Sequence, residues 1–188
     1  MRVIAGKARR LTLKSTPGLD TRPTIDRIKE TLFNIITPEI QGAAFLDLFS
    51  GSGSIGIEAL SRGARVSFFV ENNAKAVRCI RENLAHTKLE ADAVVMQKSV
   101  LSAINELSLK KCRFDIVYMD PPYHKGLEEE TLRALETSGI IDKETLIIIE
   151  ADKYNTLDFL KDTSFVIERE KVYKTNRHYF IRLGGTEE

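Results

Sequence analysis

The chain has 188 residues, of which 43% are hydrophobic and 29% charged, with 2 cysteines and a formal net charge of +1. This composition predicts one compact α/β domain that needs neither disulfides nor a structural metal, and it excludes intrinsic disorder and a disulfide scaffold. The longest apolar run, around Leu146–Ile149, is too short to cross a bilayer, and no apolar core of a secretory signal follows the basic start. We therefore expect a cytoplasmic protein with no membrane partner.

The first residues form a basic segment. No acidic residue precedes Asp20, so residues 1–19 carry a net charge of +5 and the rest of the chain a net charge of about −4. The basic residues of this segment are Arg2, Lys7, Arg9, Arg10 and Lys14. Such a segment is typical of a docking surface for a polyanion, and a merely solvated arm is the alternative. Short apolar stretches at 2–5 and 11–13 predict a small hairpin here.

Strands and helices alternate along the rest of the chain. A helix is expected from an N-cap at Thr24 to near Pro38. The expected strands are Phe45–Phe49, Arg65–Val70, Ala93–Met96, Phe114–Met119, Leu146–Ile149, Phe165–Tyr173 and His178–Leu183. The expected later helices are Ile55–Arg62, Ala74–Leu84, Val100–Leu107, Leu127–Ser138 and Tyr154–Leu160.

This order predicts a mostly parallel, seven-stranded sheet covered by helices on both faces. The last two strands are too close for a crossover helix, so they should form an antiparallel hairpin with a turn near Asn176. With no linker or repeat visible, we expect a single domain over residues 1–188, in which 1–40 is a basic extension with a helix and 41–188 is the core.

A glycine loop joins the first long strand to a helix. Gly51-Ser52-Gly53-Ser54-Ile55-Gly56 matches G-x-G-x-x-G, a pattern that lets a ligand approach the backbone closely. Glu71 follows about 20 residues later, at the end of the next strand, where a carboxylate can accept both ribose hydroxyls. The pattern predicts a cofactor that contains a nucleoside, and a glycine turn kept for packing is the alternative.

Three acids favour a particular cofactor. Asp47, Glu71 and Asp120 all lie at or near the carboxyl ends of expected strands, the edge where such sheets bind ligands. A carboxylate beside the loop repels a pyrophosphate but suits an ammonium group. The electrostatics therefore favour S-adenosylmethionine (SAM), with S-adenosylhomocysteine as product, over a nicotinamide dinucleotide.

The second motif, Asp120-Pro121-Pro122-Tyr123, closes the fourth long strand. Two prolines end the strand and stiffen the turn, which leaves carbonyl oxygens without sheet partners. Asp120 and a proline carbonyl can accept the two N–H bonds of an exocyclic base amine while Tyr123 stacks on the base. Such a hold aims the nitrogen lone pair at a methyl donor, and the base must first leave its stack.

Together these motifs resemble those of amino-methyltransferases that modify exocyclic nitrogens. More narrowly, Arg22-Pro23-Thr24 and the segment from Glu58 to Ala64 resemble the RsmD-type 16S rRNA guanine-N2 methyltransferases, and the similarity covers nearly the whole chain. The resemblance implies a Rossmann-like SAM-dependent methyltransferase fold and methylation of guanine N2 in 16S rRNA of the small ribosomal subunit. We also expect a monomer.

The candidate site residues follow from the motifs and the resemblance. The expected catalytic residues are Asp120, Pro121, Pro122 and Tyr123. The expected cofactor-binding residues are Asp47, Phe49, Gly51, Ser52, Gly53, Glu71, Asn72, Ser99 and Val100. The expected RNA-binding residues are Arg2, Lys7, Arg9, Arg10, Arg22, Arg27, His124 and Lys125. No metal is expected, since the cysteines and histidines have no ligand spacing.

Two positions depart from the family pattern. After the third strand such enzymes often carry an acid that binds the adenine amino group of SAM. Here Ser99 or a backbone carbonyl must bind that amino group instead. Lys174 follows Tyr173 where the family usually has a glycine. The alternatives are an adenine-N6 methyltransferase on DNA or RNA, a protein glutamine methyltransferase, an NAD-dependent oxidoreductase, and a non-catalytic RNA-binding factor.

Overall fold

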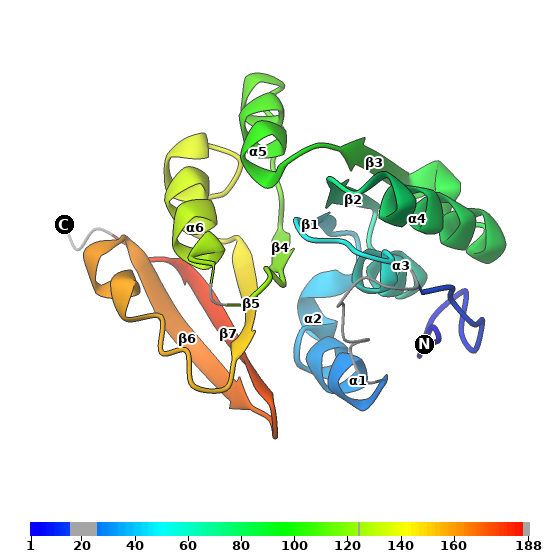
Figure 1. Ribbon diagram of the computed structural model, residues 1–188, viewed down its shortest axis with the longest axis horizontal. Coiled ribbons are helices and arrows are strands. Elements are labelled where there is room, and N and C mark those ends of the chain that lie inside the picture. Colours follow the sequence, from blue (N-terminus) through cyan, green and yellow to red (C-terminus); the bar gives the residue numbers. More distant parts are fainter. Residues whose placement is uncertain (16–25, 124, 186–188) are drawn as a thin grey trace. The chain divides into compact units, whose positions relative to one another are not determined.

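The computed structural model describes residues 1–15, 26–123 and 125–185. Its contacts divide the chain into two compact units, Met1–Ser99 and Val100–Glu188. Figure 1 shows the elements of both units. The division into two units does not test the expected single domain, which stays a prediction. No helix in the described part of the chain is both long and apolar enough to cross a membrane.

Unit 1 is built on a parallel sheet. Its elements are α1 (Asp26–Ile35), α2 (Thr37–Ile40), β1 (Ala44–Asp47), α3 (Ser54–Ser61), β2 (Val66–Glu71), α4 (Ala74–Thr87), the 3-10 helix η1 (Glu90–Asp92) and β3 (Ala93–Gln97). The strand order is β3-β2-β1, with Asp47 paired to Phe69 and Glu71 to Gln97. All four residues of β1 are buried, as expected for a strand inside a parallel sheet.

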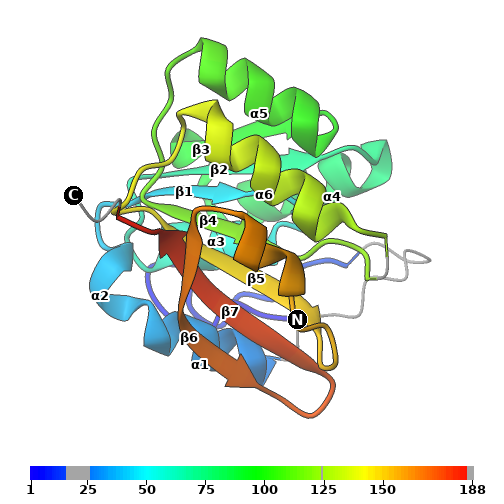
Figure 2. The ribbon, with the colours of Figure 1, turned by 90° about the vertical axis from the view of Figure 1, so that its left-hand side faces the viewer.

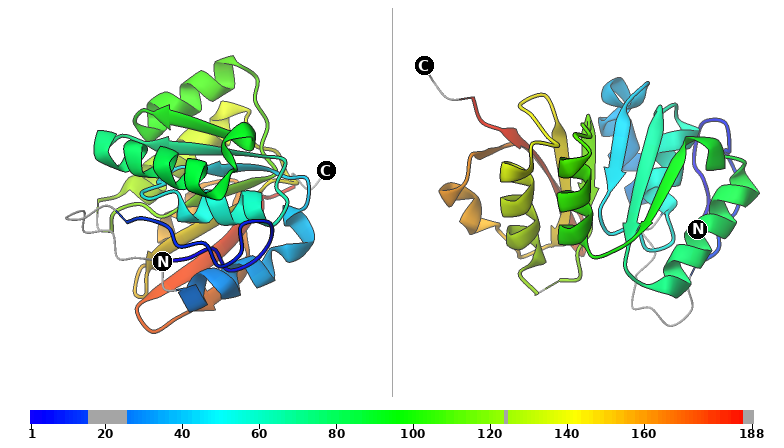
Figure 3. Two further views of the ribbon diagram at one scale, coloured as in Figure 1. Left: turned by 90° about the vertical axis from the view of Figure 1, so that its right-hand side faces the viewer. Right: turned by 90° about the horizontal axis from the view of Figure 1, so that it is seen from above.

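Unit 2 holds the antiparallel part. Its elements are α5 (Val100–Leu109), β4 (Ile116–Met119), α6 (Leu127–Ser138), β5 (Leu146–Asp152), the 3-10 helix η2 (Asp158–Asp162), β6 (Phe165–Val172) and β7 (Asn176–Leu183). β4 and β5 are parallel, and β7 is antiparallel to both β5 and β6. Figure 2 shows the β6–β7 hairpin, with β7 beside β5, and Figure 3 shows α5 and α6 side by side.

The helix ends have local causes. Asn73 caps α4, because its Oδ1 accepts hydrogen bonds from Lys75 N at 2.9 Å and Ala76 N at 3.3 Å. Gly126 and Gly139 flank α6 with φ of 67° and 70°, in the left-handed region that favours glycine. The predicted bounds of α6 are confirmed.

Some local expectations were wrong. α1 ends at Ile35, and Pro38 lies in the first turn of α2, where its missing N–H costs no helical hydrogen bond. The expected helix at 154–160 is only η2, which follows Leu157 at a φ of 49°. The expected N-cap Thr24 lies outside the described residues.

The N-terminal hairpin differs in detail from the expectation, whereas the C-terminal one does not. The N-terminal segment makes one antiparallel bridge, Arg2 to Thr12. Val3 N still donates to Leu11 O at 2.9 Å, but the amides of Ile4 and Ala5 bind Glu58 of α3 instead of a facing strand. The C-terminal antiparallel hairpin is confirmed, and Tyr173 N donates to Asn176 O at 2.8 Å, so its turn ends at Asn176, the first residue of β7. The side-chain amide of Asn176 binds Glu150 at 2.6 Å, which holds it in the strand.

Candidate functional site

The glycine loop of unit 1 is braced by Glu71. The Glu71 carboxylate accepts Gly51 N at 2.9 Å on one oxygen and Asn73 N at 2.8 Å on the other. Each carboxylate oxygen has a second lone pair, so the half-buried Glu71 can still accept ribose hydroxyls. Asn72, the next residue, is exposed.

The glycines of this loop have different roles. Gly51 has a φ of +53°, and a Cβ built on it would meet no atom of the described residues within 4 Å. Gly53 also has a positive φ, +81°, and precedes α3. A Cβ on Gly56 would lie 2.4 Å from the Phe69 ring, so this third glycine allows α3 to approach β2 closely.

Asp47 lies under the loop and is 1% exposed. Its Oδ2 accepts Gly56 N at 3.3 Å, whereas its Oδ1 is buried without a hydrogen-bond partner among the described residues. Burial, in the first place, raises the pKa of Asp47 to about 7, and the charge of Glu71 adds to this effect. An orphaned buried carboxylate oxygen fits a ligand that brings a positive charge or a donor. The two carboxylates at the loop, those of Asp47 and Glu71, therefore fit SAM better than they fit a pyrophosphate.

The remaining expected cofactor residues are dispersed. Phe49 and Ser52 are half-buried in the segment between β1 and α3, and the carbonyl of Ser52 accepts Asn83 Nδ2 at 2.9 Å. Ser99 is exposed at the end of unit 1, and Val100 begins α5 in unit 2. Within the expected cofactor set, Glu71 and Gly51 contact each other directly.

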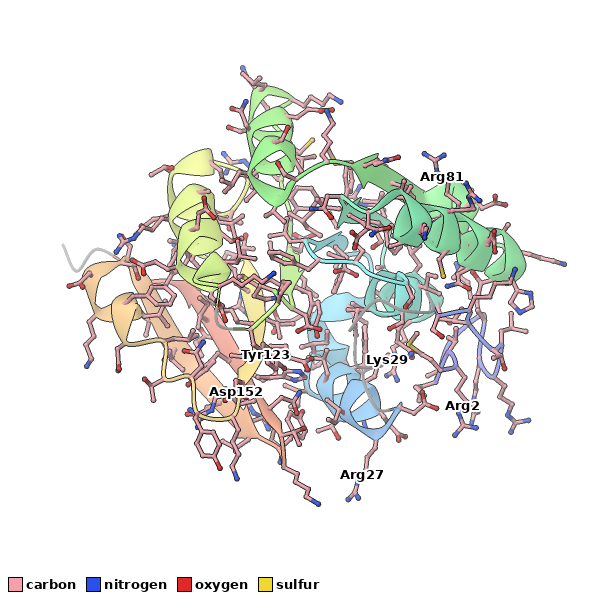
Figure 4. All side chains as sticks on the ribbon, in the orientation of Figure 1. Arg2, Arg27, Lys29, Arg81, Tyr123 and Asp152 are labelled. Carbon is pink, nitrogen blue, oxygen red and sulfur yellow. The ribbon has the colours of Figure 1, made fainter. Side chains whose placement is uncertain are left out.

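The prolyl turn of unit 2 follows β4 directly. Asp120 is half-buried, Pro121 is buried and Pro122 is exposed. Tyr123 is half-buried, and burial together with the negative charges of Glu150, Asp120 and Asp152 raises its pKa, so its hydroxyl stays protonated. Figure 4 shows Tyr123 and Asp152 in this unit.

The expected RNA-binding residues fall into two groups. Arg2 has an acidic partner, Asp26, at 3.1 Å. Lys14, a basic residue of the N-terminal segment outside the expected RNA-binding set, likewise pairs with Glu82 at 2.7 Å. The others in the described ranges are exposed at the surface: Lys7, Arg9, Arg10, Arg27 and Lys125. Arg27 points away from α1 in Figure 4. Arg22 and His124 lie outside the described residues.

Sequence reasoning missed the anchor of the N-terminal segment. Glu58 of α3 is 0% exposed and accepts Ile4 N at 2.8 Å, Ala5 N at 3.0 Å and Arg62 Nε at 2.7 Å. Lys29 of α1 is equally buried, lies 3.6 Å from Glu58 and donates to Arg2 O at 2.7 Å. The sequence signal that could have revealed this anchor is Glu58 itself, a charged residue within the otherwise mostly apolar segment of α3.

Asn83 is the second anchor, and it was also missed. It is 1% exposed and joins α4 to Lys14, whose N it accepts at 2.8 Å and to whose O it donates at 3.1 Å. Through Ser52 the same side chain reaches the glycine loop. The N-terminal segment therefore lies on α3 and α4, as Figure 3 shows for α3, and is not a free arm.

Comparisons with known proteins place this geometry in a class. The solved structure of the Escherichia coli protein yhhF matches with a TM-score of 0.83 and 35% identity over 99% of each chain. The Thermus thermophilus protein TTHA0928 matches with a TM-score of 0.83 and 29% identity over 97% of this chain and 99% of that one. These neighbours confirm the expected fold class, the Rossmann-like α/β fold of SAM-dependent methyltransferases with a mixed sheet.

The chain belongs to the family described as Conserved hypothetical protein 95, whose model matches residues 1–182. It is 38% identical over 174 residues to Ribosomal RNA small subunit methyltransferase D of Escherichia coli K12, covering 92% of this chain and 84% of that protein. It is 37% identical over 156 residues to the protein of the same name in Haemophilus influenzae, covering 81% and 79%. The predicted resemblance to RsmD-type enzymes is confirmed at the level of the family.

Proposed function

We propose that this chain transfers a methyl group from SAM to the exocyclic N2 amine of a guanine in 16S rRNA of the small ribosomal subunit. The observation that carries the proposal is the turn after β4, which sets a carboxylate, Asp120, and an aromatic ring, Tyr123, on either side of two prolines. The names of the relatives in Escherichia coli and Haemophilus influenzae support the substrate class.

The residues that would bind the methyl donor, SAM, lie in unit 1. When bound, SAM supplies a methyl group activated by a sulfonium. Asp47, with its unpartnered Oδ1, would attract the positive charge, and Glu71 would accept the ribose hydroxyls while it braces Gly51. The two acids also argue against the oxidoreductase alternative, because a dinucleotide would place a pyrophosphate beside them.

The residues that would hold the methyl acceptor, the target guanine, lie in unit 2. Asp120 and a proline carbonyl would accept the two hydrogens of N2, and Tyr123 would stack on the base. Held in this way, N2 would direct its lone pair at the methyl group that SAM supplies, with the thioether sulfur as leaving group, and one proton of N2 would pass to solvent. The amine becomes more acidic as it is methylated, so positioning supplies most of the rate and no strong base is needed.

Binding of RNA would use the exposed cations. Lys7, Arg9 and Arg10 lie on a segment that Glu58 and Asn83 hold in place, so the positive charge is presented on a fixed surface. Arg27 and Lys125 would add contacts. A monomer is proposed for the free protein, and sedimentation measures it directly.

The decisive experiment is labelled methyl transfer with product identification. Purified protein and labelled SAM are incubated with naked 16S rRNA and with small subunits from a strain that lacks the enzyme, followed by nucleoside mass analysis. We expect N2-methylguanosine. N6-methyladenosine would establish the adenine alternative, and no incorporation into either substrate would overturn the proposal. A thermal-shift control separates the oxidoreductase, since SAM should raise the melting temperature and NAD should not.

A further inference from the structure

The loop after β5 presents an aromatic ring to solvent. Tyr154 is 81% exposed, so its side chain packs on little of the fold. The ammonium of Lys153 lies 5.6 Å from the centroid of the Tyr154 ring, within the range of a cation–π contact. A ring with a cation beside it and most of its surface in water is typical of a site that stacks a flat ligand.

Hydrogen bonds hold this loop in one shape. Asp152 Oδ1 accepts Tyr154 N at 2.9 Å, and Asp152 O accepts Asn155 N at 3.0 Å, which closes a turn. Asn155 ties the turn to two other elements. Its O accepts the Tyr179 hydroxyl of β7 at 2.8 Å, and its Nδ2 donates to Glu128 of α6 at 3.2 Å. The ring of Tyr154 is therefore presented on a fixed turn, which lowers the entropy lost when a ligand binds.

The loop lies at the edge of the sheet that carries the prolyl turn. β4 and β5 are parallel neighbours, so residues 120–123 and 153–155 follow their strands at the same edge. Asp152 is opposite Asn176 in the β5–β7 ladder, so the turn of the β6–β7 hairpin lies at this edge as well, as Figure 2 shows. The charge of Asp152 also contributes to the raised pKa of Tyr123, and Figure 4 labels both side chains.

Lysines surround the loop at this edge. Lys174 lies in the turn of the hairpin and Lys171 near the end of β6, and both are exposed. Within the described part of the chain, neither these two lysines nor Lys153 forms an ion pair, whereas Arg177 is paired with Glu170 at 2.9 Å. Ammonium groups without acidic partners around an exposed aromatic ring are typical of a surface that binds single-stranded nucleic acid.

An RNA base next to the target would need such a ring. The target guanine must leave its stack to reach the prolyl turn, and each base beside it then loses a stacking partner. An aromatic side chain can replace that partner whatever the base, because every base has a π-face.

We propose that the loop after β5 is a further RNA-binding surface, on which Tyr154 stacks an unpaired base beside the target guanine while Lys153 and Lys174 contact phosphates. The inference rests on the proposed function. It adds an aromatic contact, built from residues of unit 2, to the cations that the proposed function already assigns to RNA.

Substitutions at position 154 test the stack. Tyr154→Ala should weaken the binding of a single-stranded RNA oligomer by about 5-fold or more, the effect of one lost base–aromatic stack. Tyr154→Phe keeps the ring and should bind within about 2-fold of wild type. Leu109→Ala is the control, because Leu109 is 77% exposed in the same unit, and it should leave the affinity unchanged. Wild-type affinity in Tyr154→Ala would overturn the proposal.

Salt separates the ring from the lysines. Lys153→Ala combined with Lys174→Ala should make the slope of log affinity against log salt shallower by about 0.7 for each lost phosphate contact. Tyr154→Ala should lower the affinity and leave this slope unchanged, because it removes no charge. Lys110→Ala with Lys111→Ala is the control. An equal change of slope in the two lysine pairs would contradict the phosphate contacts.

A fluorescence probe reads the stack without turnover, so its failure can be told from a failure of the proposed function. The chain contains no tryptophan, so Tyr154→Trp introduces a single one, and Leu109→Trp provides the matched control. Because a stacked base quenches indole fluorescence, we expect the single-stranded RNA oligomer to quench Tyr154→Trp and not Leu109→Trp. No quenching of Tyr154→Trp at saturating RNA would overturn the proposal even if wild-type protein methylates guanine. Quenching by small subunits but not by RNA would indicate a ribosomal protein as the partner and would overturn it as well.

Discussion

The carboxylate of Glu58 accepts a 2.8 Å hydrogen bond from the main-chain N–H of Ile4, 54 residues earlier in the chain. Ala5 N donates to the other oxygen at 3.0 Å, so the N-terminal segment is held by a side chain of α3. α3 is also the helix that begins directly after Gly53 of the glycine loop. The segment expected to meet RNA is thus joined to the helix that starts at the expected cofactor loop.

Glu58→Gln should destabilise the protein strongly. The substitution leaves the buried Lys29 ammonium without its carboxylate and removes half of the acceptor capacity that Ile4, Ala5 and Arg62 use. Breaking a buried ion pair typically costs about 3–5 kcal/mol, and urea unfolding of the variant would measure this loss. Glu82→Gln is the control, because its pair with Lys14 is exposed and should contribute little. Equal stability of the two variants would contradict a role for the Glu58 anchor.

Gly6→Ala should detach the N-terminal segment. Gly6 has a φ of +83°, and a Cβ there would lie 1.8 Å from the carbonyl oxygen of Ser61. Strain and overlap together should cost about 3 kcal/mol or more of unfolding free energy. Gly42→Ala is the matched control, because its φ is +78° but its Cβ meets nothing within 4 Å. It should lose only about 1–2 kcal/mol.

Limited trypsin digestion gives a second measurement for Gly6→Ala. Lys7, Arg9 and Arg10 are exposed, but the docked backbone protects them from cleavage. We expect faster cleavage in this segment for Gly6→Ala than for Gly42→Ala. Identical cleavage rates would show that the contact with Ser61 does not hold the segment.

Asp47 should make stability depend on pH. Burial raises its pKa from 3.8 to about 7, so between these values the unfolded chain releases a proton that the folded chain keeps. The contribution of Asp47 to stability is therefore greatest below about pH 4, falls as the pH rises through this window, and is constant above about pH 7. Urea unfolding should show this as a difference between the variant and wild type. The free energy of unfolding of Asp47→Asn minus that of wild type should be larger at about pH 8 than at about pH 4. A stability difference that does not change with pH would refute the raised pKa.

Asp120→Asn should abolish most turnover. Asparagine keeps one acceptor oxygen but loses the negative charge and the second carboxylate oxygen, so we expect about a 10- to 100-fold loss of methyl transfer. RNA affinity should be largely kept, because the exposed cations are unchanged. Asp115→Asn, just before the other end of β4, is the control and should keep the wild-type rate. Normal turnover by Asp120→Asn would remove this carboxylate from the proposed site.

Arg9→Ala combined with Arg10→Ala should weaken RNA binding in a salt-dependent way. The slope of log affinity against log salt should become shallower by about 1 for each lost phosphate contact. Lys110→Ala with Lys111→Ala is a matched control, since each pair has one residue at positive φ, Arg10 at 73° and Lys111 at 54°. An equal change of slope in both double variants would mean that the N-terminal pair is ordinary surface charge.

The sequence was sufficient for the features that are local. Apolar runs, glycines and prolines act through the conformations of neighbouring residues, so the strand–loop–helix around Gly51 and the turn at Pro121 could be predicted with their functional meaning. The limits of α6 were predictable for the same reason, because Gly126 and Gly139 bound it. Glu150 could have been found by the rule that selected Glu71, since it too is an acid at the carboxyl end of a buried strand.

Only the tertiary structure determined which partner each buried polar group has. Glu58 binds Ile4 and Glu150 binds Tyr118 across 54 and 32 residues, and no periodicity in a sequence reports which distant donors will fill a carboxylate. The cost of burying an unpaired charge makes those pairings obligatory once the chain is compact. For this reason an N-terminal segment that reads as a charged arm is held against α3 and α4, and the buried carboxylate of Glu150 in β5 takes its partners from β4 and β7.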